Sequence, residues 1–498
     1  MQRHWFFLLI FACILLALGL SGVDAGGDVL FTDQGPTLSA TEPGIGQSKR
    51  VAVNWEALNN GRSPLLKINL FNGQEITAVR DRLDPSSAAG GYVWVGHVQG
   101  ETQSAVTLSV VDDVLIGSIH SSANDPIDIR YQNGTQILQQ VDNDKRILVE
   151  GPDTAEAGFY PQARDQAQLC EDGTRIDLLV AYTAQARQQE GGTAAIAALI
   201  NQRVADMNTA NNNSGLAFDY NLVHVMETGY AETGNVSVDL PRLRDPGDGH
   251  LDDVAAARNT HLADMVSLLI AESTVNNSCG VGYVMNSLST NFAYSAMNIA
   301  ALDYIGPQYY CSAQTLAHEF GHNMGNLHDR AHNSLTPLLP YAYGYQPDSA
   351  NFRTIMSYNC PGGCPTINHW SDPDDSYNGE ATGIDHNVNP SNSADNARSM
   401  AQTAYYIANF RQNCAAEPTN TPLPTATHTP TATATNSPTA SATSLPTATH
   451  TPGPPPSATP TTAVSATPTM QISSTPTATR DLSFEPTHRS FVPLAFTR

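Results

Sequence analysis

Polar and apolar residues alternate in short runs between residues 92 and 138, with the period of two that is typical of strands with one buried face. Asp112 and Asp113 separate two of these runs, at the spacing of a tight hairpin turn. The predicted strands are Tyr92–Val98, Val106–Val110, Val114–Ile119, Ile127–Tyr131 and Thr135–Leu138. No group of catalytic residues accompanies this pattern. We therefore expect residues 26–165 to form a β-rich domain.

A different pattern begins at Arg175, where apolar runs of strand length alternate with segments of helical period. One helical stripe comprises Ile196, Leu199, Ile200, Val204 and Met207. The predicted strands are 176–183, 218–226, 264–270, 280–285 and 295–300, and the predicted helices include 251–259, about 312–325 and 394–413. This order of elements predicts an α/β domain over residues 166–414.

The two ends of the chain differ from both domains. Residues 1–25 join a basic start to the apolar run Trp5–Leu20 and a small-residue cleavage site, which is typical of a secretory signal peptide. The alternative, a membrane anchor, needs a longer apolar run. Residues 415–483 are rich in Thr, Pro, Ser and Ala, which predicts a disordered stalk. Residues 484–498 are apolar again, and are either a surface-sorting or docking tag or a frayed end.

The acidic excess disfavours some partners. The chain has 47 Asp and Glu against 24 Lys and Arg, a formal net charge of −23 at pH 7. Such a charge disfavours binding to nucleic acid or to an anionic membrane surface. After the N-terminal segment, no stretch approaches the ~18 apolar residues of a transmembrane helix. We therefore expect a secreted, soluble monomer, with any cell-surface association made through the C-terminal tail.

The candidate chemistry lies in residues 318–329, which read H-E-F-G-H-N-M-G-N-L-H-D. On a helix, residues four apart share a face, so His318 and His322 can present imidazole nitrogens to one metal ion. Glu319 lies beside the first ligand, within reach of a water on the metal. Gly325 can take a positive φ, so the helix can end and the chain can return His328 to the metal. Three neutral imidazoles leave a fourth position of Zn²⁺ open, which is the pattern of a catalytic site.

This string resembles the signature of the metzincin zinc endopeptidases, in which a Met-turn follows downstream. Thr354–Tyr358 matches that turn, with Met356 placed 38 residues after His318. Asp329, directly after the third histidine, resembles the adamalysin/reprolysin branch. The resemblance implies a mixed five-stranded sheet with an active-site helix, a methionine floor under the histidines, and an exposed antiparallel edge strand at Val281–Met285. An extended peptide substrate could pair with that strand.

Two further expectations come from the resemblance. The β-rich domain is similar to the prodomain that precedes reprolysin-like peptidases, and would act as an intramolecular inhibitor; a plain β-domain of unknown role is the alternative. Tyr358 departs from the usual reprolysin turn and resembles the serralysin and astacin turn, where a tyrosine ligates zinc at rest and swings to the oxyanion. The alternative for Tyr358 is a pocket-lining aromatic, which Asp329 favours by indicating the reprolysin branch.

Six of the seven cysteines remain once Cys13 leaves with the signal peptide, and an even count in an exported chain predicts disulfides. Cys360 and Cys364, one of the predicted pairs, enclose only Pro361–Gly363, a turn-forming sequence. Cys170 could instead be a latency thiol on zinc, but a disulfide leaves no odd thiol. The predicted pairs are Cys279–Cys311, Cys360–Cys364 and Cys170–Cys414.

The sequence thus predicts a zinc endopeptidase made as a zymogen. One catalytic Zn²⁺ would be held by His318, His322 and His328, while calcium is left undetermined. Glu319 would take a proton from the water and pass it to the leaving amine. A catalytically silent adhesion or binding module with the same fold is the alternative, and the intact Glu319 argues against it. A gluzincin with a downstream Glu as third ligand is disfavoured because His328 is already at the metzincin offset. His369 and His386 are predicted to be non-ligands.

Overall fold

The computed structural model of the protein describes residues 29–39, 44–101, 103–121, 125–142, 170–272, 278–299, 311, 313–333, 335–361 and 363–412. All of them belong to one compact unit, Met1–Thr421, and a second unit comprises Pro422–Arg498. The predicted signal peptide, stalk and C-terminal tail lie outside the described residues, as do residues 143–169.

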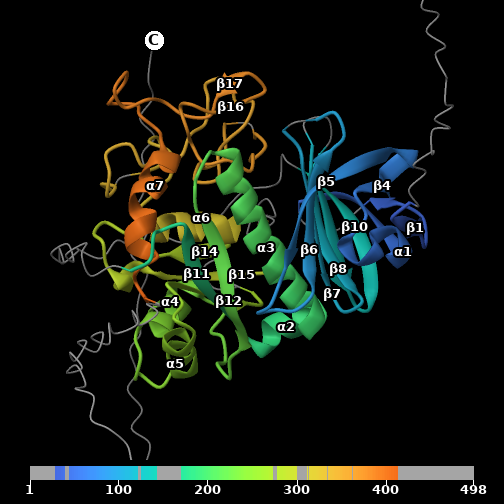
Figure 1. Ribbon diagram of the computed structural model, residues 1–498, viewed down its shortest axis with the longest axis horizontal. Coiled ribbons are helices and arrows are strands. Elements are labelled where there is room, and N and C mark those ends of the chain that lie inside the picture. The colour runs from blue at the N-terminus through green and yellow to red at the C-terminus, as the bar shows by residue number, and fades with distance from the viewer. Residues whose placement is uncertain are drawn as a thin grey trace, which may run out of the picture. The chain divides into compact units, whose positions relative to one another are not determined.

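Residues 29–142 build one ten-stranded sheet with antiparallel pairing throughout (Figure 1). The strand order is β1-β3-β10-β9-β8-β7-β6-β5-β4, with β2 paired to β3. The strands are β1 (Phe31–Asp33), β2 (Leu38–Ser39), β3 (Ile45–Val53), β4 (Leu65–Asn69), β5 (Glu75–Pro85), β6 (Tyr92–Val98), β7 (Ala105–Val111), β8 (Val114–His120), β9 (Ile127–Gln132) and β10 (Thr135–Val141). Short helical turns follow β3 and β4, namely α1 (Trp55–Leu58), η1 (Asn59–Gly61) and η2 (Phe71–Gly73).

The hairpin between β7 and β8 shows how the local sequence determines this sheet. Val111 pairs with Val114, so Asp112 and Asp113 form the two-residue turn that the sequence predicts. Asp112 has a φ of 50°, a conformation that aspartate tolerates better than most residues. The apolar positions of the strands meet in one core, which includes the fully buried side chains of Trp94, Leu108, Leu115 and Ile129. The predicted β-rich N-terminal region is therefore confirmed.

Residues 170–412 form a mixed α/β domain around a second, five-stranded sheet in the order β12-β11-β13-β15-β14. Four strands run parallel, and β14 is antiparallel to β15 at one edge. The strands are β11 (Arg175–Tyr182), β12 (Asp219–Glu227), β13 (Met265–Ile270), β14 (Gly280–Gly282) and β15 (Tyr294–Asn298). The other elements are α2 (Ala184–Glu190), α3 (Thr193–Asn213), α4 (Val236–Arg244), α5 (Asp252–His261), η5 (Thr290–Phe292), α6 (Thr315–Asn323), α7 (Asn396–Ile407) and the hairpin of β16 (Ser376–Tyr377) and β17 (Glu380–Ala381).

Strand β11 explains why the apolar runs of this domain are continuous. It pairs with β12 on one side and β13 on the other, and its residues Ile176–Tyr182 are buried. A parallel strand with helices on both faces has no solvated side, so an unbroken apolar run is what it requires. Side chains from this strand, α3 and α6 belong to a single large core that also contains Met356 and Trp370.

Three details differ from the sequence prediction. Helices α2 and α4 were not predicted. Helix α7 ends at Ile407, before the predicted Asn413, and the side chain of Asn409 then donates a hydrogen bond to the Glu171 carbonyl. The edge strand β14 is at the sheet edge and antiparallel, as expected, but it ends at Gly282, before the predicted Met285. The side chain of Val281 is only 3% exposed, because α4 and α6 pack against β14. Among the described residues, none of the helices has the length and apolar character needed to span a bilayer.

Candidate metal centre

Helix α6 presents two of the candidate ligands side by side. All nine of its residues are buried, and it packs against β14, β15 and α3. His318 and His322 lie one turn apart, and their Nε2 atoms are 3.1 Å from each other. The spacing of four residues therefore brings the two imidazoles together, as the sequence predicts.

The third histidine returns to the helix through a tight turn. Helix α6 ends at Asn323, and Gly325 has a φ of +93°, which confirms the predicted left-handed stop. Leu327 is then fixed by hydrogen bonds with the backbones of Ala342 and Gly344. His328 Nε2 consequently lies 3.1 Å from His322 Nε2 and 3.2 Å from His318 Nε2.

The outer ring nitrogens hold two of the imidazoles in place. His318 Nδ1 is 2.8 Å from the Ile355 carbonyl, and His322 Nδ1 is 2.9 Å from the Asn326 carbonyl. A carbonyl oxygen can only accept, so each Nδ1 carries the proton and each Nε2 keeps its lone pair. These lone pairs face a common point, and the three rings form the group of described residues suited to hold a metal ion. For tetrahedral zinc with Zn–N of about 2.05 Å, the nitrogens would be about 3.3 Å apart, close to the observed separations.

Met356 lies against the helix that carries the first two histidines. It is fully buried, and a Cβ added to Gly321 would overlap its Sδ atom. The glycine within the helix is therefore what lets the methionine sulfur approach the helix between the two histidines. The turn itself is held by Arg353, whose Nη1 donates to the Ser357 carbonyl at 2.9 Å.

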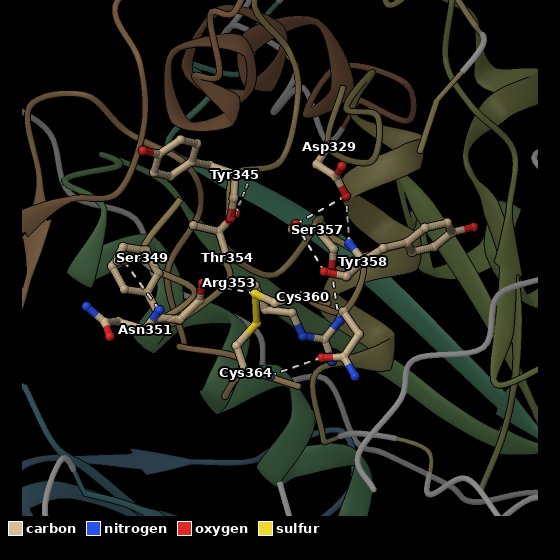
Figure 2. The surroundings of a disulfide bond; sticks show 12 residues. Asp329, Tyr345, Ser349, Asn351, Arg353, Thr354, Ser357, Tyr358, Cys360 and Cys364 are labelled. Atoms are coloured by element: carbon tan, nitrogen blue, oxygen red, sulfur yellow. Dashed lines mark hydrogen bonds between the residues drawn. A yellow bond between two sulfur atoms is a disulfide. The ribbon is translucent and has the colours of Figure 1, made fainter. Parts of the chain in front are cut away.

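Asp329, the residue after the third histidine, is hydrogen-bonded to the Met-turn, as Figure 2 shows. Its Oδ2 accepts from the Tyr358 backbone N–H at 3.0 Å and from Ser357 Oγ at 3.2 Å. Its other oxygen contacts His332 Nδ1 at 2.8 Å. The carboxylate is thus directed at the turn and away from the centre of the triangle, so its contribution is to position His328.

Glu319 lies beside the triangle and is 1% exposed. Its side chain is covered by the backbone of edge strand β14, at Gly280 and Gly282. Asn323 holds the strand and helix together, since its Nδ2 donates to the carbonyls of Tyr283 and Tyr294 at 3.0 and 2.9 Å.

Tyr358 is beside the third histidine, but through its ring. The ring centroids of Tyr358 and His328 are 4.4 Å apart, with the planes tilted by 27°. Figure 2 shows the Tyr358 side chain directed away from Asp329. This stacking suits a ring that lines the centre, and the placement allows either of the roles predicted for Tyr358.

Sequence reasoning missed the residues that follow Asp329. Arg330 lies over the Tyr343 ring, with its guanidinium carbon 3.9 Å from the centroid. Its hydrogen bonds to described residues all go to neutral acceptors, the Ser393 carbonyl, Ser393 Oγ and the Pro340 carbonyl. Burial lowers the pKa of Arg330. The position of Arg330, two residues after His328, was the signal in the sequence that could have indicated it.

Arg330 also lines a cavity of about 860 Å³, whose lining begins at Asp329, the residue after the third histidine. His332 and Pro361 line the same cavity, together with the acidic residues Asp329 and Asp348. The cavity thus lies between the segment after the third histidine and the Cys360–Cys364 loop that follows the Met-turn.

The cysteines and the two histidines predicted to be non-ligands have other partners. Disulfides join Cys279 to Cys311 and Cys360 to Cys364. Cys170 is also disulfide-bonded, so it is not a free thiol, while the predicted partner Cys414 lies outside the described residues. His369 contacts Asp375 Oδ2 at 2.7 Å, and His386 contacts Ser393 Oγ at 3.0 Å.

Comparison with known proteins identifies a matching family and several similar proteins. Residues 172–371 match the family described as "Metallo-peptidase family M12". A protein of Xanthomonas campestris pv. campestris named "Peptidyl-Asp metalloendopeptidase" is 31% identical over 435 residues, which cover 80% of this chain and 97% of that protein. A protein of the same name from Stenotrophomonas maltophilia is 31% identical, covering 70% of this chain and 83% of its own length. Another, from Pseudomonas fragi, is 30% identical and covers 40% of this chain and 95% of its own length.

Proposed function

This chain belongs to metallo-peptidase family M12 and is a metalloendopeptidase of the reprolysin-like type, and from that premise we propose that it hydrolyses peptide bonds with one zinc ion held by His318, His322 and His328. The observation that carries the proposal is the triangle of Nε2 atoms, 3.1 to 3.2 Å apart, with two of the rings oriented by backbone carbonyls. Nitrogen donors at this separation suit zinc. The alternative of a catalytically silent adhesion module is not favoured, because a module without catalysis has no chemical need for the Glu319 carboxylate.

A zinc ion held there would lower the pKa of a water to ~7 and polarise the scissile carbonyl. We assign the general base to Glu319, which takes a proton from the attacking water and passes it to the leaving amine nitrogen. Its place next to His318 and its burial against β14 support this role, because both restrict where the carboxylate can lie. Met356 supplies the apolar floor on which the ligands rest.

The substrate would bind as an extended strand along β14. This strand is at the edge of the sheet, and among the described strands it pairs only with β15. Its free edge offers backbone hydrogen bonds to a peptide, and these hold the scissile bond without regard to sequence. Burial of the strand's side chains against α4 and α6 leaves recognition to its backbone.

We further propose that the enzyme prefers substrates with aspartate at the cleaved bond, as the name of the relatives suggests. An aspartate side chain needs a cation, and residues 170–412 contain no lysine. Arg330 supports the proposal, because it lines the cavity beside the third histidine and its partners among the described residues are neutral. Its guanidinium could therefore donate hydrogen bonds to a substrate carboxylate without losing an existing ion pair.

Export through the signal peptide and synthesis as a zymogen complete the proposal. The even set of six cysteines and the disulfides of the peptidase region support an oxidising destination. Because Cys170 is disulfide-bonded, latency would come from the folded β-rich region and not from a thiol on zinc.

Peptide hydrolysis by the purified protein tests the proposal. Wild-type protein should cleave a peptide library with a preference for aspartate, and a zinc chelator should abolish the cleavage. Glu319→Gln should keep the fold and the zinc content but lose about 10²–10⁴-fold in kcat. Near-wild-type turnover of Glu319→Gln at equal zinc content would contradict the assigned base. Cleavage without regard to aspartate would contradict only the substrate preference.

A further inference from the structure

Two glycines of edge strand β14 face the carboxylate that the proposed mechanism uses. Gly280 and Gly282 are two residues apart, so they lie on the same face of the strand. A Cβ added to Gly280 would overlap Glu319 Oε1 and lie 2.7 Å from Glu319 Cδ. A Cβ added to Gly282 would lie 2.6 Å from the Glu319 backbone oxygen and 3.2 Å from Oε2. The Glu319 side chain fills the space that these two missing side chains leave.

Backbone conformation does not account for the glycines. Neither has a positive φ, so any residue could adopt the conformation of Gly280 or Gly282. Glycine inside a strand is less favourable than alanine, because it loses more conformational freedom on folding. The strand is therefore less stable for having glycines here, and the close approach to Glu319 is what requires them.

The strand cannot move back to make room for a side chain. Gly280 pairs with Met297, and Gly282 with Ser295, in the antiparallel ladder with β15. On the other side, the Met285 backbone N–H donates to the His322 carbonyl at 2.9 Å, directly on the helix that carries Glu319. A group added to Gly280 must therefore be accommodated by the side chain opposite, because that side chain is the softer partner.

We propose that Gly280 and Gly282 are positioning residues that hold the Glu319 carboxylate in its working place, an inference that rests on the proposed role of Glu319 as the base. The two glycines act differently. Gly280 faces the carboxylate end of Glu319, which can rotate away, so a methyl there displaces the base at little cost in stability. Gly282 faces the backbone of α6, which cannot rotate, so a methyl there strains the helix itself.

The central test is Gly280→Ala. We expect the variant to keep its zinc content and its Tm, to lose about 10²-fold in kcat, and to change KM little, because only the base is moved. A crystal structure of the variant should show the Glu319 carboxylate turned away from the three histidines. Gly282→Ala should instead lower Tm. Gly229→Ala is the matched control, because Gly229 has no atom within 4 Å of an added Cβ and no positive φ, and it should leave kcat and Tm unchanged.

A double-mutant cycle separates positioning from a general structural effect. In the Glu319→Gln background the base is already absent, so Gly280→Ala should cause no further loss of the residual rate. An equal fold-loss in both backgrounds would overturn the inference, as would a wild-type kcat for Gly280→Ala. Loss of fold or zinc in Gly280→Ala would also overturn it, because the clash is then not absorbed by the side chain. If Glu319→Gln alone keeps full activity, it is the proposed base that fails.

Discussion

At the scale of single residues, the two positions after His328 have different partners. Asp329 turns to the Met-turn and accepts hydrogen bonds from Ser357 and Tyr358. Arg330 turns to the cavity and rests on the Tyr343 ring. Asp329 therefore fixes the segment that carries His328, while we propose that Arg330 contacts the substrate.

Replacement of Arg330 tests the preference for aspartate. Arg330→Gln should lower kcat/KM for an aspartate peptide by about 10–100-fold and leave an alanine peptide unaffected, because a hydrogen bond to a charged group contributes about 1.5–3 kcal/mol. Arg398→Gln is a matched control. Arg398 also stacks on a tyrosine, Tyr341, at 4.3 Å, but it does not line the cavity. An unchanged ratio of the two peptides in Arg330→Gln would assign recognition to another residue.

Tyr358→Phe separates the two roles of Tyr358. If its hydroxyl stabilises the oxyanion, the variant should lose about 10²-fold in kcat with little change in KM, because one donor to the developing charge is removed. The ring stack on His328 needs no hydroxyl and survives the change. Steady-state kinetics at equal zinc content decide the matter, and an unchanged kcat would leave Tyr358 as a lining residue.

At the scale of elements, helix α3 packs against the cores of two domains. Its residues Ile196, Ile200 and Met207 belong to the core of the peptidase region. Ala195, Ala198 and Leu199 instead pack against Val111, Val114 and Ile116 of the β-rich sheet. The sequence pattern had placed Leu199 on the same stripe as Ile196 and Ile200, but it belongs to this second contact. This explains why polar positions such as Asn201 are also buried, although the sequence pattern shows only one apolar stripe.

A buried carboxylate on α3 lies within this contact. Asp206 accepts hydrogen bonds from Ser118 of β8 and from Gln202, and Arg203 and Asp128 are the charged groups around it. Burial raises the pKa of Asp206 to about 6, with the neighbouring hydrogen bonds and Arg203 opposing that rise. Because the folded-state pKa exceeds the unfolded value of 3.8, the folded state binds the extra proton. Its stability is therefore greater below the unfolded pKa and falls as pH rises through about 6.

Asp206→Asn removes this pH dependence. At pH 8 the variant should have a free energy of unfolding about 1–3 kcal/mol above wild type, because no buried charge has to be desolvated. The advantage should shrink between pH 6 and pH 4, where the wild-type carboxyl becomes protonated. Urea unfolding at pH 4, 6 and 8 measures the difference. A difference of the same size at all three pH values would contradict the role of the charge.

At the scale of the whole molecule, the chain divides into parts that need not depend on one another. The composition of residues 415–483, poor in apolar and charged residues, predicts a stalk without a core of its own. Truncation after Ala416 should therefore leave kcat/KM on a soluble peptide, and Tm, unchanged. The full-length chain assayed in parallel is the reference. A large loss of either quantity would show that the tail contributes to the catalytic domain.

The sequence alone determined the features that depend on neighbours along the chain. Period-two runs located β6 to β10, and the four-residue spacing of His318 and His322 placed two imidazoles on one helix face. Gly325 marked the end of that helix, because only a positive φ returns His328 within so few residues. In each case a short-range rule of geometry is sufficient.

Only the tertiary structure decided the features that depend on segments far apart in the chain. Nothing local distinguishes Gly280 from any other strand glycine, and its approach to Glu319 exists only once β14 packs on α6. The burial of α3 on both faces likewise needs the β-rich sheet, whose contacting strands lie about eighty residues earlier in the chain. Side-chain periodicity records which face of an element is apolar, but not which other element covers it, and that choice is made by packing.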